Sequence, residues 1–546
     1  MRLRTPQLGH VHEAKATPQL LVLAEPLLLE GLKRLLEADH RLATTTDELN
    51  GKVDLVIWSC GGDLPIATLQ RELLQLQERW QPAPVLLLLE AQAAYSAEEL
   101  LRLPCEGLLQ QAEPGEIPAA VSTLLSGGRV VELRPLAVSV PPPEPIGLGQ
   151  WLLRSGLNQI QAEQRRCRQW LEQSEGALSR LLLRGRLREL AAAQRLILWL
   201  WAPVSMAFAD TPQPITPRLD PRDQGLAITL RQRTAEGVWQ TIQQRLLEAV
   251  AQGVSNQSGQ LLALDGLATE HRRDLLHALI SQLDLLITRL RHEQVRGVEL
   301  EQRWHQQQPE LRRLSLRSMA GEYVQLPQEG GLLPVAASLV EASELSSLDP
   351  DLPVAHPMLA ALVQAQPLLV QGRLLAPDEP QALLHLELLI SNWLIRTAEL
   401  ISAEILSCCS TWPELRRYLL KSDLLATRNL ERLRNQLNAQ QRWCNLFERP
   451  VQLYESQRVL YHLEQGAITP VLLTEPRDSE LGQLTWSQQL ITLSLEARDA
   501  LAPQLHSFFR RFGDLVVVVL TQVIGRAIGL VGRGILQGMG RTVSRA

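Results

Sequence analysis

Up to about residue 130, short apolar runs alternate with stretches in which leucines recur at helical spacing. The runs Leu20–Leu23, Val53–Trp58 and Pro84–Leu89 are almost entirely apolar, which favours strands buried on both faces of a sheet. Between them, Pro26–Ala38 and Leu64–Trp80 place leucines three or four residues apart, which indicates helices. Shorter strands are predicted at Arg41–Thr45 and Gly107–Leu109, and shorter helices at Asp47–Lys52, Ala97–Leu103 and Pro114–Ser126. The alternation predicts a parallel sheet covered by helices on both faces.

A proline-rich stretch marks the end of this pattern. Residues 134–147 contain four prolines within five positions, which favours an extended, semi-rigid spacer. Long stretches rich in Leu, Arg, Gln and Glu follow and predict helices at Trp151–Trp201, 225–320, Ala382–Leu406, Trp412–Glu448 and Leu481–Arg511. Two segments differ: Asp210–Asp223 contains four prolines and is predicted as a loop, and the prolines and glycines of Tyr323–Pro380 favour a small hairpin.

These changes of pattern predict the domain organisation. We expect a flexible N-terminus at 1–19, an α/β domain at 20–131, a linker at 132–148 and a mostly α-helical domain at 149–546, with a subdivision near 325–380. The fold class is therefore an N-terminal α/β domain followed by a large, mostly helical one.

Composition narrows the classes of protein that fit. The chain has 54 Lys and Arg against 59 Asp and Glu, a net charge of −5, which argues against a bulk electrostatic grip on nucleic acid. Six cysteines form neither a C-x-x-C motif nor a disulfide framework, so a reducing compartment fits best. The first twenty residues lack the apolar core of a secretory signal. We therefore expect a cytoplasmic protein, either free or peripheral to a membrane.

Three stretches of the α/β region carry a resemblance to a known family. Pro26–Leu32 reads P-L-x-x-E-G-L, Asp54–Ser59 reads D-x-V-x-x-S, and Gly127–Val130 reads G-G-R-V. In this order and spacing they resemble the flavodoxin-like receiver domain of response regulators, most closely receivers that precede LuxR-type DNA-binding domains. The resemblance covers about residues 19–131 and implies a flavodoxin-like fold.

The same resemblance implies where phosphotransfer residues would stand. Receivers use an acidic pair after the first strand to hold Mg²⁺, an Asp acceptor at the end of the third strand and a Lys after the fifth. Here the acidic pair falls on Leu23 and Ala24, the acceptor on Ser59 and the Lys on Gln110. We therefore expect a pseudo-receiver that takes no phosphate, no metal and no cofactor. Glu25 and Asp63 leave a shifted site open, although an ordinary polar loop rim is the simpler interpretation.

The last third of the chain resembles an uncharacterised family conserved in cyanobacteria and some algal plastids. The residues that carry this resemblance lie at Asn392–Glu399, Glu431–Asn438, Pro450–Ser456, Glu496–Asp499 and Ile524–Leu530. The family implies a class and a location but no established activity. Since the histidines form no H-E-x-x-H and no Ser lies in G-x-S-x-G, we expect no enzyme and no catalytic residues.

Cations and aromatic residues gather between residues 412 and 443. The candidate basic face comprises Arg416, Arg417, Lys421, Arg428, Arg432 and Arg434. Such a cluster suits nucleic acid or anionic lipid. Because Glu414, Asp423 and Glu431 interrupt it, we favour a solvated or ion-paired helix surface over a nucleic-acid site.

The tail combines apolar residues with regularly spaced glycines. The candidate positions are Gly525, Arg526, Gly529, Arg533, Gly534 and Gly538. Small-residue faces allow helices to approach closely in a membrane, but two arginines sit awkwardly in a spanning segment. Packing inside the protein and peripheral membrane contact through 515–540 are left as equal alternatives.

Together these observations predict a non-enzymatic regulatory or scaffold protein that acts through contacts with protein partners not identified by sequence. In receivers the last helix–strand–helix face commonly forms such contacts, which implies a homo-oligomer through about residues 96–128. Two alternatives stay open: a DNA-binding transcription regulator, and a membrane-peripheral assembly factor of a cyanobacterium or plastid.

Overall fold

The computed structural model describes residues 17–44, 52–61, 64–90, 95–134, 226–328, 331–346 and 349–496. Several predicted features lie outside these ranges. They are most of the N-terminus 1–19, the helix at Asp47–Lys52, all but the first residues of the linker 132–148, the helix Trp151–Trp201, the loop Asp210–Asp223 and the tail beyond residue 496.

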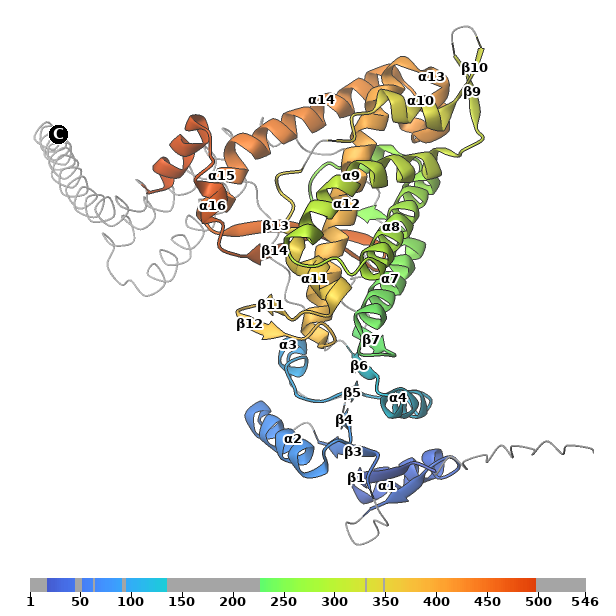
Figure 1. The fold of residues 1–546 in the computed structure, drawn as a ribbon, viewed down its shortest axis with the longest axis vertical. Helices are drawn as coiled ribbons and strands as arrows, with labels where there is room; N and C mark the ends of the chain where they lie inside the picture. Colours follow the sequence, from blue (N-terminus) through green and yellow to red (C-terminus); the bar gives the residue numbers. More distant parts are fainter. Residues whose placement is uncertain are drawn as a thin grey trace, which may run out of the picture. The chain divides into compact units, whose positions relative to one another are not determined.

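A seven-stranded sheet organises the N-terminal region (Figure 1). Its strands are β1 (Gln19–Leu23), β2 (Arg41–Ala43), β3 (Leu55–Cys60), β4 (Val85–Leu89), β5 (Gly107–Gln110), β6 (Arg129–Leu133) and β7 (Leu226–Leu230), in the order β2-β1-β3-β4-β5-β6-β7. The first six strands run parallel. The predicted α/β class with a parallel sheet is thus confirmed.

Helices cover both faces of this sheet, as its apolar strands require. They are α1 (Pro26–Leu36), α2 (Ile66–Trp80), α3 (Ala97–Leu100) and α4 (Glu116–Leu125). Leu20, Ile57 and Leu86 point to the face where α1 and α4 pack. Alternate residues such as Leu87 point the other way, and α2 packs against β4. All five residues of β4 are buried, which explains its unbroken apolar sequence.

The sixth and seventh strands were not predicted, since the last strand expected from the sequence was Gly107–Leu109. We expected a helical chain from residue 225, but β7 pairs antiparallel with β6, from Leu133 opposite Leu226 to Arg129 opposite Leu230. Ile228 and Leu230 are buried, whereas the alternate residues Ala227 and Thr229 are exposed. This alternation suits an edge strand covered on one face. The sheet therefore extends beyond the predicted range 20–131. Strand β6 runs to Leu133, and β7 comes from the part of the chain that was expected to be helical.

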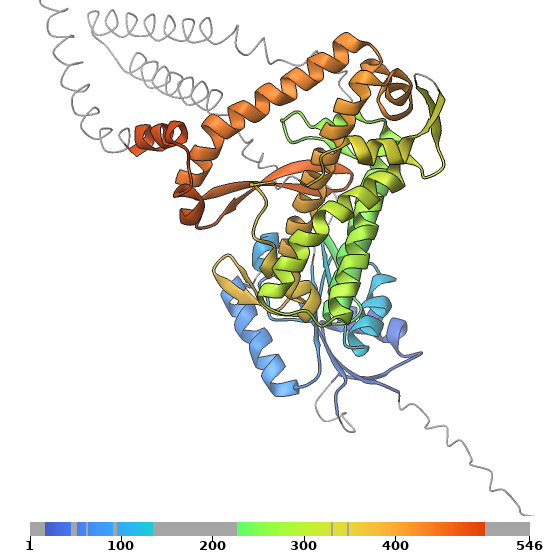
Figure 2. The same cartoon turned by 45° about the horizontal axis from the view of Figure 1, so that its top comes forward.

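The chain after β7 is mostly helical, as predicted. Its longer helices are α7 (Ala235–Gln252), α8 (Thr269–His292), α9 (Val298–Ala320), α11 (Ala355–Gln364) and α12 (Pro380–Thr411). In Figures 1 and 2, α8 and α9 lie side by side and α12 runs through the same bundle. The predicted apolar helix Ala382–Leu406 is confirmed within α12, most of whose residues are buried.

Further helices and two hairpins lie between and after these helices along the chain. They are the 3-10 helices η3 (Ala263–Gly266) and η4 (Ser422–Leu424), the helices α10 (Val335–Ala342), α13 (Pro413–Leu419) and α14 (Thr427–Trp443), and two hairpins, β9 (Gln325–Gln328) with β10 (Gly331–Pro334) and β11 (Leu368–Val370) with β12 (Arg373–Leu375). Both hairpins fall in the segment 323–380, where one was predicted.

A three-stranded sheet was missed by the sequence analysis. It joins β13 (Gln457–Glu464), β14 (Ala467–Thr474) and the short β8 (Ser255–Asn256). The turn between β13 and β14 consists of Gln465 and Gly466, both with positive φ (49° and 77°). Two left-handed residues in a two-residue turn match the twist of a hairpin, and Gly466 adopts this conformation without steric cost.

The described residues form two compact units. The first holds the residues up to 437 together with 459–471, and the second holds 438–458 and 472–496. The second unit contains the π-helix η5 (Cys444–Glu448), α15 (Arg449–Tyr454), α16 (Asp478–Leu481) and the helical residues 486–496. The buried Arg458 and Arg477 both pair with Glu480, 2.6 and 2.5 Å away, and tie its segments together.

Candidate functional site

The receiver-like positions meet at one edge of the sheet. Neighbouring strands are in register as Leu23 opposite Trp58, Ser59 opposite Leu88, and Leu89 opposite Gln110. Because parallel strands end at the same edge, Leu23, Ala24, Ser59 and Gln110 are gathered there. The resemblance implied this juxtaposition.

The chemistry of this edge differs from that of a phosphate-accepting site. None of the four positions carries a carboxylate, and Gln110 is buried with its Oε1 accepting the backbone N–H of Arg134 (3.3 Å). Burial, together with Glu72 and Glu90, raises the pKa of the neighbouring Cys60 thiol, so the thiol form dominates. In the described ranges, no three His, Cys, Asp or Glu side chains are grouped to hold a metal ion. Asp63 of the shifted-site hypothesis lies outside those ranges.

Arg416 does not belong to a basic surface, which corrects one residue of the predicted face. Its side chain is buried and donates hydrogen bonds to the carbonyls of Cys409 (3.2 Å), Ser410 (3.2 Å) and Leu425 (3.1 Å). The last carbonyls of a helix lack partners within the helix. Arg416 thus caps the carboxyl end of α12 rather than facing a ligand.

The other five cations do not gather on one open surface. Arg417 pairs with Glu414 (3.3 Å) and Arg434 with Glu431 (2.8 Å), each within its own helix. Lys421 is half-buried, and burial together with the nearby Arg272 lowers its pKa. Arg428 and Arg432, one turn apart on α14, are the members that stay exposed and unpaired within the described part of the chain.

Two arginines share one aspartate where the seven-stranded sheet meets the helices of the first unit. Asp378, just before α12, lies 2.6 Å from Nε of Arg233 and 3.6 Å from Nη2 of Arg129 on β6. The Arg129 side chain is 9% exposed and that of Asp378 is 14% exposed. Burial and the neighbouring Arg233 lower the pKa of Arg129, while Asp378 opposes both. The aspartate therefore stabilises two charges that would otherwise repel.

A second contact joins the sheet region to the helices. Nη2 of Arg102, which follows α3, lies 3.2 Å from Oε1 of Gln371 in the turn of the β11–β12 hairpin. Arg102 belongs to the face 96–128 for which the resemblance implied a homo-oligomer. Part of that face thus contacts a hairpin of the same chain.

Three polar residues of α12 lie on one face of this helix because they are spaced i, i+4 and i+7. Oδ1 of Asn392 accepts the backbone N–H of Tyr461 on β13 (3.0 Å). Arg396 lies 3.5 Å from Asp349 and 3.5 Å from Asp351, with its guanidinium 5.2 Å from the centre of the Tyr461 ring. Asn392 thus contacts β13, and Arg396 contacts both β13 and the segment before α11. Both segments are distant from these residues in sequence.

Glu399 is the third residue of this face. Its carboxylate accepts the N–H groups of Ala263 (2.7 Å) and Leu264 (2.8 Å), the first residues of η3. Burial raises the pKa of Glu399 to about 7, with Asp265 adding to the shift and the two hydrogen bonds and Arg396 opposing it. The role of these three residues was not predicted from the sequence, although their helical spacing could have shown that they share a face.

The raised pKa of Glu399 predicts a pH dependence of stability. A carboxyl whose pKa is higher in the folded than in the unfolded state stabilises the fold fully below about 4.5 and loses this contribution as pH rises through about 7. We expect the free energy of unfolding to fall by about 2–3 kcal/mol between these limits because of this group. Urea denaturation at several pH values should show that Glu399→Gln removes this slope.

The matched control is Glu310→Gln, which removes an exposed carboxylate of α9. This variant should keep the pH dependence of the parent chain. An unchanged slope in Glu399→Gln would contradict the assignment.

The tail positions Gly525, Arg526, Gly529, Arg533, Gly534 and Gly538 lie outside the described residues. Neither packing nor membrane contact through 515–540 is therefore tested. Within the described ranges, no helix combines the length and the apolar character needed to cross a membrane.

Two family models match the chain. Residues 349–540 match a "Protein of unknown function (DUF3685)" model, and residues 147–201 match "Cyanobacterial response regulator, helical hairpin domain". The first match includes Asn392, Arg396 and Glu399. The second falls in the stretch that follows the predicted receiver, where the response-regulator resemblance would place a further domain.

Relatives come from a cyanobacterium and from algae. A "Ycf55-like protein" of Synechocystis sp. is 31% identical over 411 residues, which cover 72% of this chain and 71% of the relative. An "Uncharacterized protein ycf55" of Pyropia yezoensis is 26% identical over 154 residues (27% of this chain, 48% of the relative), and one of Porphyra purpurea is 27% identical over 136 residues (25% and 42%). No solved structure matches the chain. With a cyanobacterial relative matched over more than two thirds of both chains, the chain belongs to the Ycf55-like family.

Proposed function

We propose that the chain is a non-enzymatic regulatory or scaffold protein whose N-terminal α/β region is a flavodoxin-like pseudo-receiver. The order β2-β1-β3-β4-β5 supports this assignment, because it is the strand order of flavodoxin-like domains. The match of residues 147–201 to a response-regulator domain supports it independently of the fold.

One observation carries the proposal: the positions implied by the receiver resemblance gather at one strand-end edge, and none of them is a residue that phosphotransfer needs. Magnesium ions prefer carboxylate oxygens, and Leu23 and Ala24 offer none. An acyl phosphate needs a carboxylate at position 59, which is Ser59. We infer that this region serves through the surface that it presents, and the class of partner that we propose for it is a protein.

The alternative of a DNA-binding regulator has less support. Arg416 is buried, and Arg417 and Arg434 are paired with glutamates, so the predicted basic face keeps fewer free cations for a phosphate backbone than the sequence implied. The proposed partner is therefore a protein. One such partner is a second copy of the chain, bound through residues 96–128.

Incubation with a small-molecule phosphodonor and Mg²⁺ tests the proposal. We expect the intact mass of the full chain to remain unchanged, because position 59 has no carboxylate to form an acyl phosphate. A response-regulator receiver that keeps its acceptor Asp serves as the positive control and should gain one phosphoryl group in parallel. A stable gain of one phosphoryl group on residues 19–131 of this chain would refute the pseudo-receiver.

A further inference from the structure

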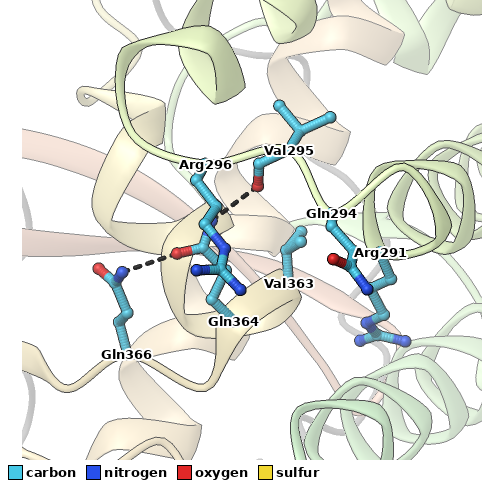
Figure 3. A pocket seen from close by; sticks show the side chains of 7 residues that line it. All are labelled: Arg291, Gln294, Val295, Arg296, Val363, Gln364 and Gln366. Carbon is cyan, nitrogen blue, oxygen red and sulfur yellow. Dashed lines mark hydrogen bonds between the residues drawn. The ribbon is translucent and has the colours of Figure 1, made fainter.

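A pocket opens beside the turn between α8 and α9, away from the receiver edge. Its volume is about 410 Å³, and its walls come from the end of α8, the following turn and the end of α11. Figure 3 shows Arg291 and Gln294 on one side of Val363, and Arg296, Gln364 and Gln366 on the other. The lining holds two guanidinium groups and three amides but no carboxylate.

Arg291 supplies a fixed positive charge to this pocket. Its Nε and Nη2 donate to the carbonyl of Leu362 (3.0 and 2.7 Å), and Nη2 also donates to the carbonyl of Ala235 (3.0 Å). These acceptors are neutral, and in the described part of the chain no carboxylate lies within ion-pair distance of Arg291. The guanidinium is therefore held in place by the end of α11 without being neutralised there.

Arg296 supplies the second charge. It is exposed, and within the described residues it makes neither an ion pair nor a hydrogen bond. The one acidic neighbour in the turn, Glu293, pairs instead with Arg289 on α8 (3.4 Å). The charge of Arg296 is thus available to a ligand.

The amides of the pocket are ordered by their own hydrogen bonds. Nε2 of Gln366 donates to Oε1 of Gln364 (2.7 Å), and Nε2 of Gln364 donates to the carbonyl of Val295 (2.7 Å), as the dashed lines in Figure 3 mark. This chain links the end of α11 to the α8–α9 turn. The turn that carries Arg296 is therefore tied to the end of α11.

We propose that this pocket binds an anion of phosphate or carboxylate type. The Nε and Nη2 groups of Arg291 already bind carbonyls, so its Nη1 is the donor left to a ligand, whereas Arg296 can offer paired N–H···O bonds. An arginine already held by carbonyls loses little freedom on binding. Gln294 adds a polar side chain at the rim, and the volume admits an anion larger than a single phosphate. This binding is independent of the pseudo-receiver, so the failure of one leaves the other standing.

Titration of the full-length chain with pyrophosphate by calorimetry at low ionic strength tests the proposal. We expect saturable binding at one site that Arg296→Gln weakens by at least tenfold, because the variant removes one of two facing charges. Arg313→Gln is the matched control: it removes the same charge from an exposed position of α9 outside the pocket, and its affinity should equal that of the parent. Arg291→Lys, checked by circular dichroism for folding, should also weaken binding because lysine cannot reproduce the bonds to the carbonyls of Leu362 and Ala235 that hold the charge in the pocket.

A second experiment distinguishes a free anion from a lipid headgroup. Flotation with vesicles that contain phosphatidylglycerol is compared for the parent, Arg296→Gln and Arg313→Gln. Pyrophosphate binding that depends on Arg296 supports a free anion, and vesicle binding that depends on Arg296 without pyrophosphate binding supports the same site with a lipid headgroup. The proposal would be overturned if the chain bound neither pyrophosphate nor the vesicles, or if Arg296→Gln and Arg313→Gln weakened binding equally.

Discussion

Replacing Asp378 by Asn should lower the free energy of unfolding of the first compact unit by about 3–4 kcal/mol, because removing one partner of a buried ion pair leaves the other charge uncompensated. Here the aspartate serves two arginines, one of which, Arg129, is almost fully buried. Without it, Arg129 and Arg233 face each other with no carboxylate between them. Urea denaturation followed by tryptophan fluorescence measures the loss, since Trp239 on α7 is buried in this unit.

A double variant separates this charge effect from a general disturbance. Adding Arg129→Met to Asp378→Asn removes the uncompensated charge and should recover a large part of the lost stability. Glu98→Gln is the surface control: it breaks the exposed pair with Arg102 and should cost less than about 1 kcal/mol. If Asp378→Asn is no more costly than Glu98→Gln, Asp378 does not hold the sheet to the helices.

Replacing Gly128 by Ala should separate β6 from β7. A Cβ at this position would lie 2.5 Å from the carbonyl oxygen of Leu230 and 3.0 Å from that of Thr123, and backbone atoms cannot turn aside as a flexible side chain can. We expect a loss of about 3 kcal/mol, at the upper end of the cost of overpacking. Hydrogen exchange should accelerate in both strands, which would locate the effect.

Gly31→Ala is the matched control for this prediction. Gly31 lies inside α1, and a Cβ there would meet nothing within 4 Å. The same change should therefore stabilise the chain by about 0.5–1 kcal/mol, because alanine favours the helix over glycine. Equal effects of the two substitutions would contradict a close approach of β6 and β7 at Gly128.

The elements that could be predicted from the sequence are those that are buried along most of their length. Strand β4 is covered on both faces, so each of its residues is apolar, and α12 is buried over most of its length, so its leucines and isoleucines recur on every side. In both cases the local sequence reflects the local environment. The gathering of residues at the strand-end edge was implied by the receiver resemblance rather than by the pattern of any one strand.

The elements that were missed depend on partners distant in sequence. Leu226–Leu230 becomes a strand because β6 lies open beside it, and β13 pairs into a sheet whose third strand is β8, about two hundred residues earlier. Pairing of this kind leaves only a weak alternation in the sequence.

Charged residues show the same dependence. Arg416 and Arg417 are neighbours of one type, yet one is buried against the end of α12 and the other is exposed. Only the place where α12 ends distinguishes them. Asp378 likewise reveals its role only when Arg129 and Arg233 are brought to it by the fold.

The pairing of β6 with β7 also bears on how the chain is connected. Leu133, the last residue of β6, lies opposite Leu226, the first residue of β7. The end of β6 and the start of β7 are thus neighbours in the sheet, although the matched segment 147–201 stands between them in the sequence. The entropy of closing a loop grows only slowly with its length, and insertions between paired strands are therefore well tolerated. A short hairpin turn should be able to replace the residues between the two strands, which makes them a cassette that can be removed or exchanged while both strands keep their register.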